Sequence, residues 1–242
     1  MSVRQPRIIG VLGGMGPAAT LDFLHKPQCA TPAASDQEHL HLLVDLNPQV
    51  PDRNAALAGI GPSPGPMLAQ MARRLEAAGA QALVMVCNSA HAYAADIHEA
   101  AHEARLINMI DETVAAVRQS YPDSRRVGLL AASACLDARL YQNAFERTGV
   151  QVIVPTGDLR GRFMTLLYRI KAGDVGASSR AEMADIAKTL GKAGAEVIVS
   201  GCTEVPLVLA PDETDLPLVD STDVLVAATL TFASGEDAQK CG

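Results

Sequence analysis

The sequence lacks most of the features that mark membrane-spanning, aromatic-rich or secreted proteins. It contains no tryptophan, and aromatic residues make up only 3% of its 242 residues, so the core must consist of Ala, Val, Leu and Ile. Such a core favours closely packed layers of helix and sheet over an aromatic-rich β-sandwich. The longest apolar runs, such as Ala82–Cys87, have the length of a strand and are too short to cross a membrane. The N-terminal run MSVRQPRIIG turns apolar too early and too briefly for a secretory signal, so we expect a cytoplasmic protein.

The sequence also lacks an excess of basic residues and any closely spaced cysteine pair. Its formal net charge of −7 argues against nucleic acid or an anionic membrane as a partner, because binding to phosphates needs a basic face. A small anionic substrate needs only one or two local cations and is compatible with this charge. The five cysteines are odd in number, widely spaced and without a Cys-x-x-Cys pair, so they indicate neither a disulfide framework nor a zinc site. We therefore expect free thiols and no bound metal.

Short apolar runs alternate along the chain with amphipathic stretches of helical periodicity. Several apolar runs lack period-two alternation, as is typical of strands covered by helices on both faces. The predicted strands are Ile8–Leu12, His39–Leu46, Ala82–Cys87, Leu106–Ile107, Arg126–Leu130, Gln151–Val154, Glu196–Ser200 and Leu216–Val219. The predicted helices are Pro17–Lys26, Met67–Ala78, His91–Ala101, Glu112–Ser120, Ser133–Thr148, Phe163–Lys171, Ser178–Ala193 and Thr222–Phe232. This repeated order of strand and helix predicts an α/β fold with parallel sheets.

The second half of the chain resembles the first. Ala78–Cys87 aligns without gaps on Ala193–Cys202, and Ile9–Leu12 aligns on Val127–Leu130 in the same order. Two matches at nearly equal offsets favour an internal duplication over a chance recurrence of apolar strands. We therefore predict two similar lobes, each a parallel sheet flanked by helices, related by pseudo-twofold symmetry and with the active site in the cleft between them.

The predicted boundary assigns residues 1–113 together with 220–242 to an N-terminal lobe and residues 114–219 to a C-terminal lobe. The final helix is expected to return and pack on the N-terminal lobe. The polar tail that follows Gly235 is expected to be frayed, and its Cys241 to have no role.

Two cysteines occupy equivalent places in the repeat, Cys87 in the first half and Cys202 in the second. Each follows a buried strand, at the end where parallel sheets form their ligand crevices. Each also precedes a predicted helix start, where unpaired backbone N–H groups favour a thiolate. Two thiols that approach one cleft from opposite sides suit racemisation, in which one group removes a proton from one face and another delivers a proton to the opposite face. Cys29 and Cys135 are instead expected to be buried core residues.

Several sequence blocks carry a resemblance to a known family. They are Gly13–Pro17, Thr31–Ala33 with Asp36–His39, Pro51–Arg53, Cys87–His91, Lys171–Gly173 and Gly201–Glu204. In this order they resemble the aspartate/glutamate racemase family, and its aspartate racemase branch most. The cell-wall glutamate racemases of the same superfamily typically carry Asp-Ser-Gly near the N-terminus and His after the second Cys-Thr, where this chain has Gly-Gly-Met and Glu204. The resemblance implies a two-lobed α/β fold, a homodimer, and racemisation by two bases without pyridoxal phosphate or any other cofactor.

The resemblance also assigns roles to individual residues. Cys87 and Cys202 would be the catalytic acid and base. Arg53 and Lys171 align with the family's positions for binding the distal carboxylate of the substrate, and Arg53 can bind it with two hydrogen bonds. The substrate-binding residues are completed by Met15, Asn88, Ser89, Thr203 and Glu204. Asn88, Ser89 and Thr203 suit the stabilisation of the carboxylate next to the carbanion.

The predicted reaction is the interconversion of L- and D-aspartate, with glutamate as the next candidate substrate. Other enzymes of the same superfamily remain alternatives: a racemase of broader amino acid or hydantoin specificity, or a maleate isomerase. A small-molecule sensor that keeps the cleft without turnover is the non-enzyme alternative. A nucleotide-binding loop at Gly10–Gly16, with Asp45 as the ribose ligand, is a weaker reading because the spacing is not Gly-x-Gly-x-x-Gly.

Three further features make local predictions. Pro27 should end or kink the first helix, because proline disrupts a helix interior. The segment Asn47–Pro66, which is rich in proline and glycine, reads as a loop that either closes over the cleft or forms an ordinary surface connection. His91 lies about one helical turn after Cys87 and reads as a hydrogen-bonded neighbour of the site. His39 and His41 alternate with leucines and read as strand residues.

Overall fold

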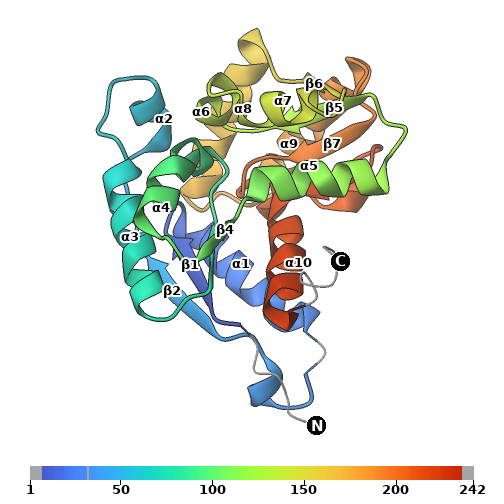
Figure 1. The fold of residues 1–242 in the computed structure, drawn as a ribbon. Helices are drawn as coiled ribbons and strands as arrows, with labels where there is room; N and C mark the ends of the chain where they lie inside the picture. Colours follow the sequence, from blue (N-terminus) through green and yellow to red (C-terminus); the bar gives the residue numbers. More distant parts are fainter. Residues whose placement is uncertain (1–6, 32, 236–242) are drawn as a thin grey trace.

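The computed structural model describes residues 7–31 and 33–235 and folds them into two parallel four-stranded sheets flanked by helices (Figure 1). The first sheet has the strand order β2-β1-β3-β4 and the second the order β6-β5-β7-β8. The strands are β1 (Ile9–Gly13), β2 (Leu42–Leu46), β3 (Ala82–Met85), β4 (Arg105–Ile107), β5 (Arg126–Leu130), β6 (Gln151–Ile153), β7 (Val197–Ser200) and β8 (Leu218–Asp220). All eight predicted strands are present, and the predicted α/β fold with two lobes is confirmed.

The helices α1 to α9 lie between consecutive strands, as expected for parallel strands, and α10 follows β8. They are α1 (Pro17–Ala30), α2 (Arg53–Leu57), α3 (Gly65–Ala77), α4 (Ala94–Ala100), α5 (Met109–Ser120), α6 (Ser133–Asp137), α7 (Leu140–Glu146), α8 (Gly157–Lys171), α9 (Ala177–Lys192) and α10 (Ser221–Ser234). Short 3-10 helices are η1 (Asp36–Glu38), η2 (Ser89–Tyr93), η3 (Val205–Leu207) and η4 (Pro211–Glu213). Within the part of the chain that the structure describes, no helix is both long and apolar enough to cross a membrane.

Glycines at equivalent positions of the internal repeat have the same structural role in both lobes. A Cβ atom on Gly10 of β1 would lie 2.8 Å from Leu83, and one on Gly128 of β5 would lie 2.8 Å from Ile198. Leu83 and Ile198 are themselves paired by the repeat, so the same close approach of strand to strand occurs in both lobes. The equivalent turns before β3 and β7 use Gly79 at φ +102° and Gly194 at φ +100°, a conformation that favours glycine.

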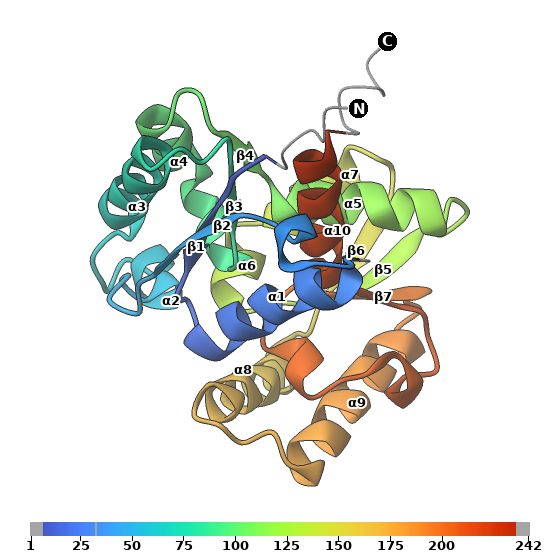
Figure 2. The same ribbon diagram turned by 90° about the horizontal axis from the view of Figure 1, so that it is seen from below.

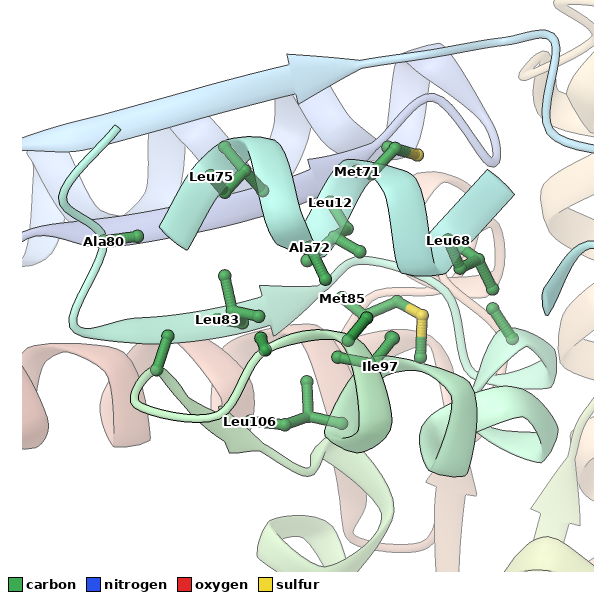
Figure 3. Close-up of a cluster of buried hydrophobic side chains, with 14 of the residues drawn as sticks. Leu12, Leu68, Met71, Ala72, Leu75, Ala80, Leu83, Met85, Ile97 and Leu106 are labelled. Carbon is green, nitrogen blue, oxygen red and sulfur yellow. The ribbon is translucent and has the colours of Figure 1, made fainter. Parts of the chain in front are cut away.

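The core of the N-terminal sheet positions the first catalytic candidate. Figure 3 shows the side chains of α3 directed at those of β1, β3 and α4. Leu12, Leu68 and Leu83 belong to this cluster and are all buried. Met85, the last residue of β3, belongs to the same cluster. Its packing fixes the end of the strand two residues before Cys87.

The last helix, α10, lies beside α1 and α5 (Figures 1 and 2). Lys26 of α1 binds Asp220 at 2.9 Å and Asp223 at 2.8 Å, which ties the start of α10 to the N-terminal lobe. This return agrees with the predicted packing of the final helix. We keep the division into residues 1–113 with 220–242 and 114–219 as a proposal, and Cys241 lies outside the described residues.

Pro27 and Arg139 mark two differences between the predicted and the observed helices. The prediction that Pro27 ends α1 is wrong, because the helix continues to Ala30. Proline removes one backbone donor, but its own carbonyl still accepts hydrogen bonds from the backbone N and the hydroxyl of Thr31 at 3.0 and 2.7 Å, and its ring is buried. The predicted helix Ser133–Thr148 is divided into α6 and α7 by Arg139, whose φ of 52° is left-handed.

Replacement of Gly14 tests the loop that follows β1. Gly14 has a φ of +94°, and a Cβ atom there would lie 2.4 Å from the backbone carbon of Asn47. Gly14→Ala should therefore destabilise the protein by about 3 kcal/mol, from left-handed strain together with the steric clash. Gly59→Ala is the matched control, since Gly59 has a φ of +72° with nothing within 4 Å. It should cost only about 1 kcal/mol in urea unfolding, and equal losses for the two variants would contradict the close approach.

Candidate active site

One cavity lies beyond the carboxyl ends of four strands, two from each sheet. Residues that follow β1 and β3 meet residues that follow the equivalent strands β5 and β7. The cavity is lined by Met15, Arg53, Asn54, Cys87, Asn88, Ser89, Ala132, Lys171, Cys202, Thr203 and Glu204. All nine site residues predicted from the sequence are among them, so the structure brings the whole predicted set together at one place.

The two candidate thiols have equivalent positions. Cys87 lies two residues after β3, and Cys202 lies two residues after β7. Both are buried, with 6% of the surface of Cys87 and 7% of the surface of Cys202 exposed. Both line the same cavity, one from each lobe. A molecule in this cavity therefore has one thiol from each half of the internal repeat.

Cys202 is bonded to a buried carboxylate. Its Sγ donates to Oε2 of Glu204 at 3.0 Å, and the Thr203 hydroxyl donates to the same oxygen at 3.4 Å. Burial and the negative charge of Glu204 raise the pKa of Cys202 well above its ordinary value, against the opposing effect of Lys171. In this arrangement Cys202 carries its proton.

Lys171 at the end of α8 balances the Glu204 carboxylate. Its Nζ lies 3.3 Å from Oε1 of Glu204. Burial lowers the pKa of Lys171, but the negative charge of Glu204 opposes burial, and the net pKa is raised. Lys171 is therefore an ammonium ion, and its nearest charged partner is a protein carboxylate.

Arg53 is held by backbone carbonyls. It begins α2, and the side chain of Asp52 caps this helix by accepting from Ala55 N at 2.7 Å. The Arg53 guanidinium donates to the carbonyls of Val50 at 3.2 Å, Pro51 at 3.0 Å and Met15 at 3.1 Å. Its Nε is buried and, among the described residues, has no hydrogen-bond partner. Three of its five N–H donors are therefore bonded to backbone, and Arg53 brings a fixed positive charge to the cavity.

The segment Asn47–Pro66 contains a helix and contacts the second lobe. Besides α2, it includes Asn54, whose Oδ1 accepts from Ala134 N at the start of α6 at 3.0 Å. The reading of this segment as a plain loop is therefore wrong, because Asp52 supplies a helix cap within the proline-rich stretch. The segment bridges the two lobes at the cavity wall.

His91 holds the backbone of Cys87. Its Nδ1 donates to the Cys87 carbonyl at 2.9 Å, and its Nε2 accepts from Met109 N at 3.1 Å. Burial lowers the pKa of His91 to about 4, so the ring is neutral near pH 7. Both nitrogens are thus engaged with backbone, as a supporting neighbour of the site requires.

Of the two cysteines predicted to be core residues, only one is buried in the structure. Cys135 is buried as expected, but Cys29 is exposed on α1, with its Sγ 3.4 Å from Nε2 of His25. The prediction of a buried Cys29 is wrong because α1 continues past Pro27 and presents this position to solvent. Within the described part of the chain, no group of three His, Cys, Asp or Glu side chains could hold a metal ion.

The glycine-rich loop after β1 serves chain packing. Gly14 N donates to the Thr20 hydroxyl at 2.9 Å, and Gly13 lies where a Cβ atom would meet Thr20 at 2.4 Å. Asp45, the ribose ligand in the nucleotide reading, binds Arg74 at 2.5 Å. These contacts account for the glycines and for Asp45 without a nucleotide.

Sequence reasoning missed four residues of the site and its surroundings. Asn54 and Ala132 line the cavity, while Tyr141 and Ser221 bind Asn88 from other elements. The pattern Asp52-Arg53-Asn54 with its helix cap was an available indication for Asn54. Tyr141 lies 53 positions from Asn88 in the chain, and no local pattern connects the two.

The structure thus directs one buried thiol from each lobe of an α/β fold into one small polar cavity. The family profile described as Asp/Glu/hydantoin racemase matches residues 12–229. The chain belongs to this family, and it is accordingly an isomerase of the racemase type.

Individual relatives agree with this family. Aspartate racemase of Picrophilus torridus superposes with a TM-score of 0.84 at 26% identity, over 95% of this chain and 94% of that one. Glutamate racemase of Francisella tularensis shares the fold, with a TM-score of 0.71 at 18% identity, over 97% of this chain and 83% of that one. A broad-specificity amino-acid racemase of Bacillus subtilis is 23% identical over 93% of this chain and 97% of its own length.

Proposed function

We propose that the protein interconverts L- and D-aspartate, with Cys87 and Cys202 as the two proton-transfer groups. The observation that carries the substrate class is the buried Arg53, whose partners among the described residues are backbone carbonyls and not a carboxylate. A buried charge without a counter-ion is costly, so an anionic substrate would stabilise it. The overall similarity to an aspartate racemase supports aspartate as that substrate.

The proton transfer uses one thiolate and one thiol. Cys202 holds its proton because Glu204 accepts its hydrogen bond, so we assign the acid to Cys202 and the base to Cys87 in this direction. The Cys87 thiolate takes the α-proton of one enantiomer, and the Cys202 thiol protonates the resulting carbanion on the opposite face. The products are the other enantiomer, a Cys87 thiol and a Cys202 thiolate. This last state starts the reverse reaction.

The carbanion is stabilised through the carboxylate next to it. Asn88 and Ser89 follow Cys87, and Thr203 follows Cys202, so each thiol has polar groups adjacent to it at the cavity wall. Hydrogen-bond donors placed where negative charge develops lower the barrier for proton removal. The reaction as proposed needs only side chains, with no pyridoxal phosphate or metal.

Glu204 lines the cavity, as its predicted substrate-binding role requires, and it also contacts two other site residues. One of its oxygens faces Cys202 and the other faces Lys171. We propose that it sets the protonation of Cys202 and that Lys171, beside it, contributes positive charge toward the substrate. Met15 contributes a buried wall to the cavity.

We also propose that the protein works as a cytoplasmic homodimer without nucleic acid or membrane partners, as the family resemblance and the acidic composition suggest. A broader amino acid specificity is the second candidate function. It is favoured by the Bacillus subtilis relative and by the pairing of Lys171 with Glu204, which leaves Arg53 as the main cation for a side-chain carboxylate.

Arg53→Ala distinguishes these specificities. If Arg53 binds the distal carboxylate, the variant should lower kcat/KM for aspartate about 10²-fold more than for alanine, because only aspartate loses a charged hydrogen bond. α-Proton exchange of both amino acids, followed by NMR in D₂O, measures the ratio. Arg73→Ala, at an exposed arginine of α3 outside the cavity, is the control. Equal losses for the two substrates would contradict the assignment of Arg53, and exchange of many amino acids by the wild type would favour broad specificity.

A further inference from the structure

Tyr141 connects the two loops that carry the candidate thiols. It is the second residue of the α7 helix, in the second half of the chain, and is completely buried. Its hydroxyl donates to Oδ1 of Asn88, the residue after Cys87, at 2.6 Å. Its ring packs against Gly201, the residue before Cys202, where an added Cβ would lie 3.1 Å from Tyr141 Cε2. A single side chain therefore contacts both catalytic loops without itself lining the cavity.

The distances determine which way the Asn88 amide points. A separation of 2.6 Å fits an O–H···O hydrogen bond and is shorter than the usual range for N–H···O. The other end of the amide lies 3.1 Å from Oγ of Ser221, which fits an N–H donor. Oδ1 therefore faces Tyr141, and the amide nitrogen faces Ser221.

The amide nitrogen carries two hydrogens, and Ser221 accepts only one of them. Asn88 also lines the cavity, so the second N–H is the polar group that this side chain has left for a bound molecule. Burial raises the pKa of Tyr141, and the neighbouring Thr113 and Ser221 hydroxyls do not offset it. Tyr141 thus stays protonated and keeps its role as donor across the working pH range.

We propose that Tyr141 is a positioning residue that orients Asn88 to present an N–H donor to the α-carboxylate of the substrate. This inference rests on the proposed racemase function, because a group beside Cys87 must lie near the α-carbon and its carboxylate. The orientation makes the site selective for an acid over the matching α-carboxamide. A carboxamide places an N–H₂ group where a carboxylate oxygen would accept, and a fixed N–H donor meets it unfavourably.

Tyr141→Phe tests the orientation while it keeps the ring against Gly201. Without the hydroxyl the Asn88 amide is free to turn its carbonyl toward the cavity. The comparison substrate is isoasparagine, the α-carboxamide of aspartate. The ratio of kcat/KM for aspartate to kcat/KM for isoasparagine should fall about tenfold, the effect of one lost hydrogen bond. For aspartate KM should rise because the carboxylate is bound in the ground state, and kcat should also fall because the hydrogen bond strengthens as negative charge develops in the transition state.

Two further variants separate orientation from general loss of structure. Ser221→Ala removes the second partner of Asn88 but leaves Tyr141 on Oδ1, so it should keep the preference for the acid. Tyr168→Phe, on the exposed face of α8, should leave both substrates unaffected. An unchanged acid-to-amide ratio in a folded Tyr141→Phe would overturn the proposal, whatever the loss in total rate.

Calorimetric binding in the Cys87→Ser background provides a second measurement that needs no turnover. The dissociation constants of aspartate and isoasparagine should converge when Tyr141→Phe is added. A wild-type protein that binds aspartate selectively but does not exchange its α-proton would refute the racemase function and leave the positioning role standing. Equal binding of both ligands before the Tyr141 substitution would refute the positioning role itself.

Discussion

Cys87→Ser and Cys202→Ser are each expected to lower racemisation of aspartate about 10³-fold, in both directions. A serine hydroxyl keeps the size of the site but is far less acidic than a thiol, so it neither forms the base nor readily donates a proton. Because the two enantiomers have equal free energy in water, kcat/KM must fall equally for L- and D-aspartate. Circular dichroism at a fixed wavelength follows both directions.

Cys29→Ser is the matched control for these variants. Its thiol is exposed on α1 and does not line the cavity. The control should racemise aspartate at the wild-type rate. Full activity in either Cys87→Ser or Cys202→Ser would show that one thiol suffices and would contradict the paired mechanism.

Glu204→Gln is expected to lower kcat/KM about 10²-fold near neutral pH and to change its pH dependence. In the wild type the Glu204 charge raises the pKa of Cys202, while Lys171 opposes it. Without the carboxylate, Lys171 would stabilise the thiolate, so the pKa of Cys202 would fall. The thiol form needed as acid would then be lost at lower pH, and the alkaline limb of the profile should shift to lower pH.

Glu196→Gln serves as the control for this substitution. Glu196 lies directly before β7, at the end of the strand away from Glu204, and does not line the cavity. Its carboxylate accepts a hydrogen bond from Arg125 N at 2.7 Å. It should leave the profile unchanged. An alkaline limb at the same pH in Glu204→Gln and the wild type would show that Glu204 does not control Cys202.

The regular part of the fold follows from local sequence patterns. Strands such as β5 were predicted with their observed bounds, because apolar runs and turn glycines identify buried parallel strands. The repeat placed Cys87 and Cys202 at equivalent strand ends. Once the strand order is known, the carboxyl ends of parallel strands bring these positions to one crevice. This is why the two thiols could be assigned to one crevice from the sequence, while the family resemblance supplied Arg53 and Lys171.

Local patterns fail where a single contact decides the outcome. The α2 helix lies in a proline-rich segment, and its formation depends on the Asp52 cap. Pro27 is tolerated because the adjacent turn remains bonded through Thr31. The role of Glu204 could not be read from its neighbours, since it depends on Lys171 from a different helix.

Tyr141 shows the same limit most clearly. Its sequence surroundings are those of an ordinary core helix residue, and its position between two loops arises only when both lobes have folded. Contacts of this kind join residues distant in the chain, so they depend on tertiary packing and not on local propensity. They are also the contacts that orient the polar groups of the site.

The most direct test of the paired thiols is the fate of the α-hydrogen when wild-type protein acts on L-aspartate in D₂O. A base and an acid on opposite faces exchange their own protons with solvent between turnovers. At early conversion the D-aspartate formed should therefore carry deuterium at the α-carbon, while the remaining L-aspartate keeps its protium. Product that retains the original hydrogen, or equal deuteration of both enantiomers from the start, would contradict two-base racemisation by Cys87 and Cys202.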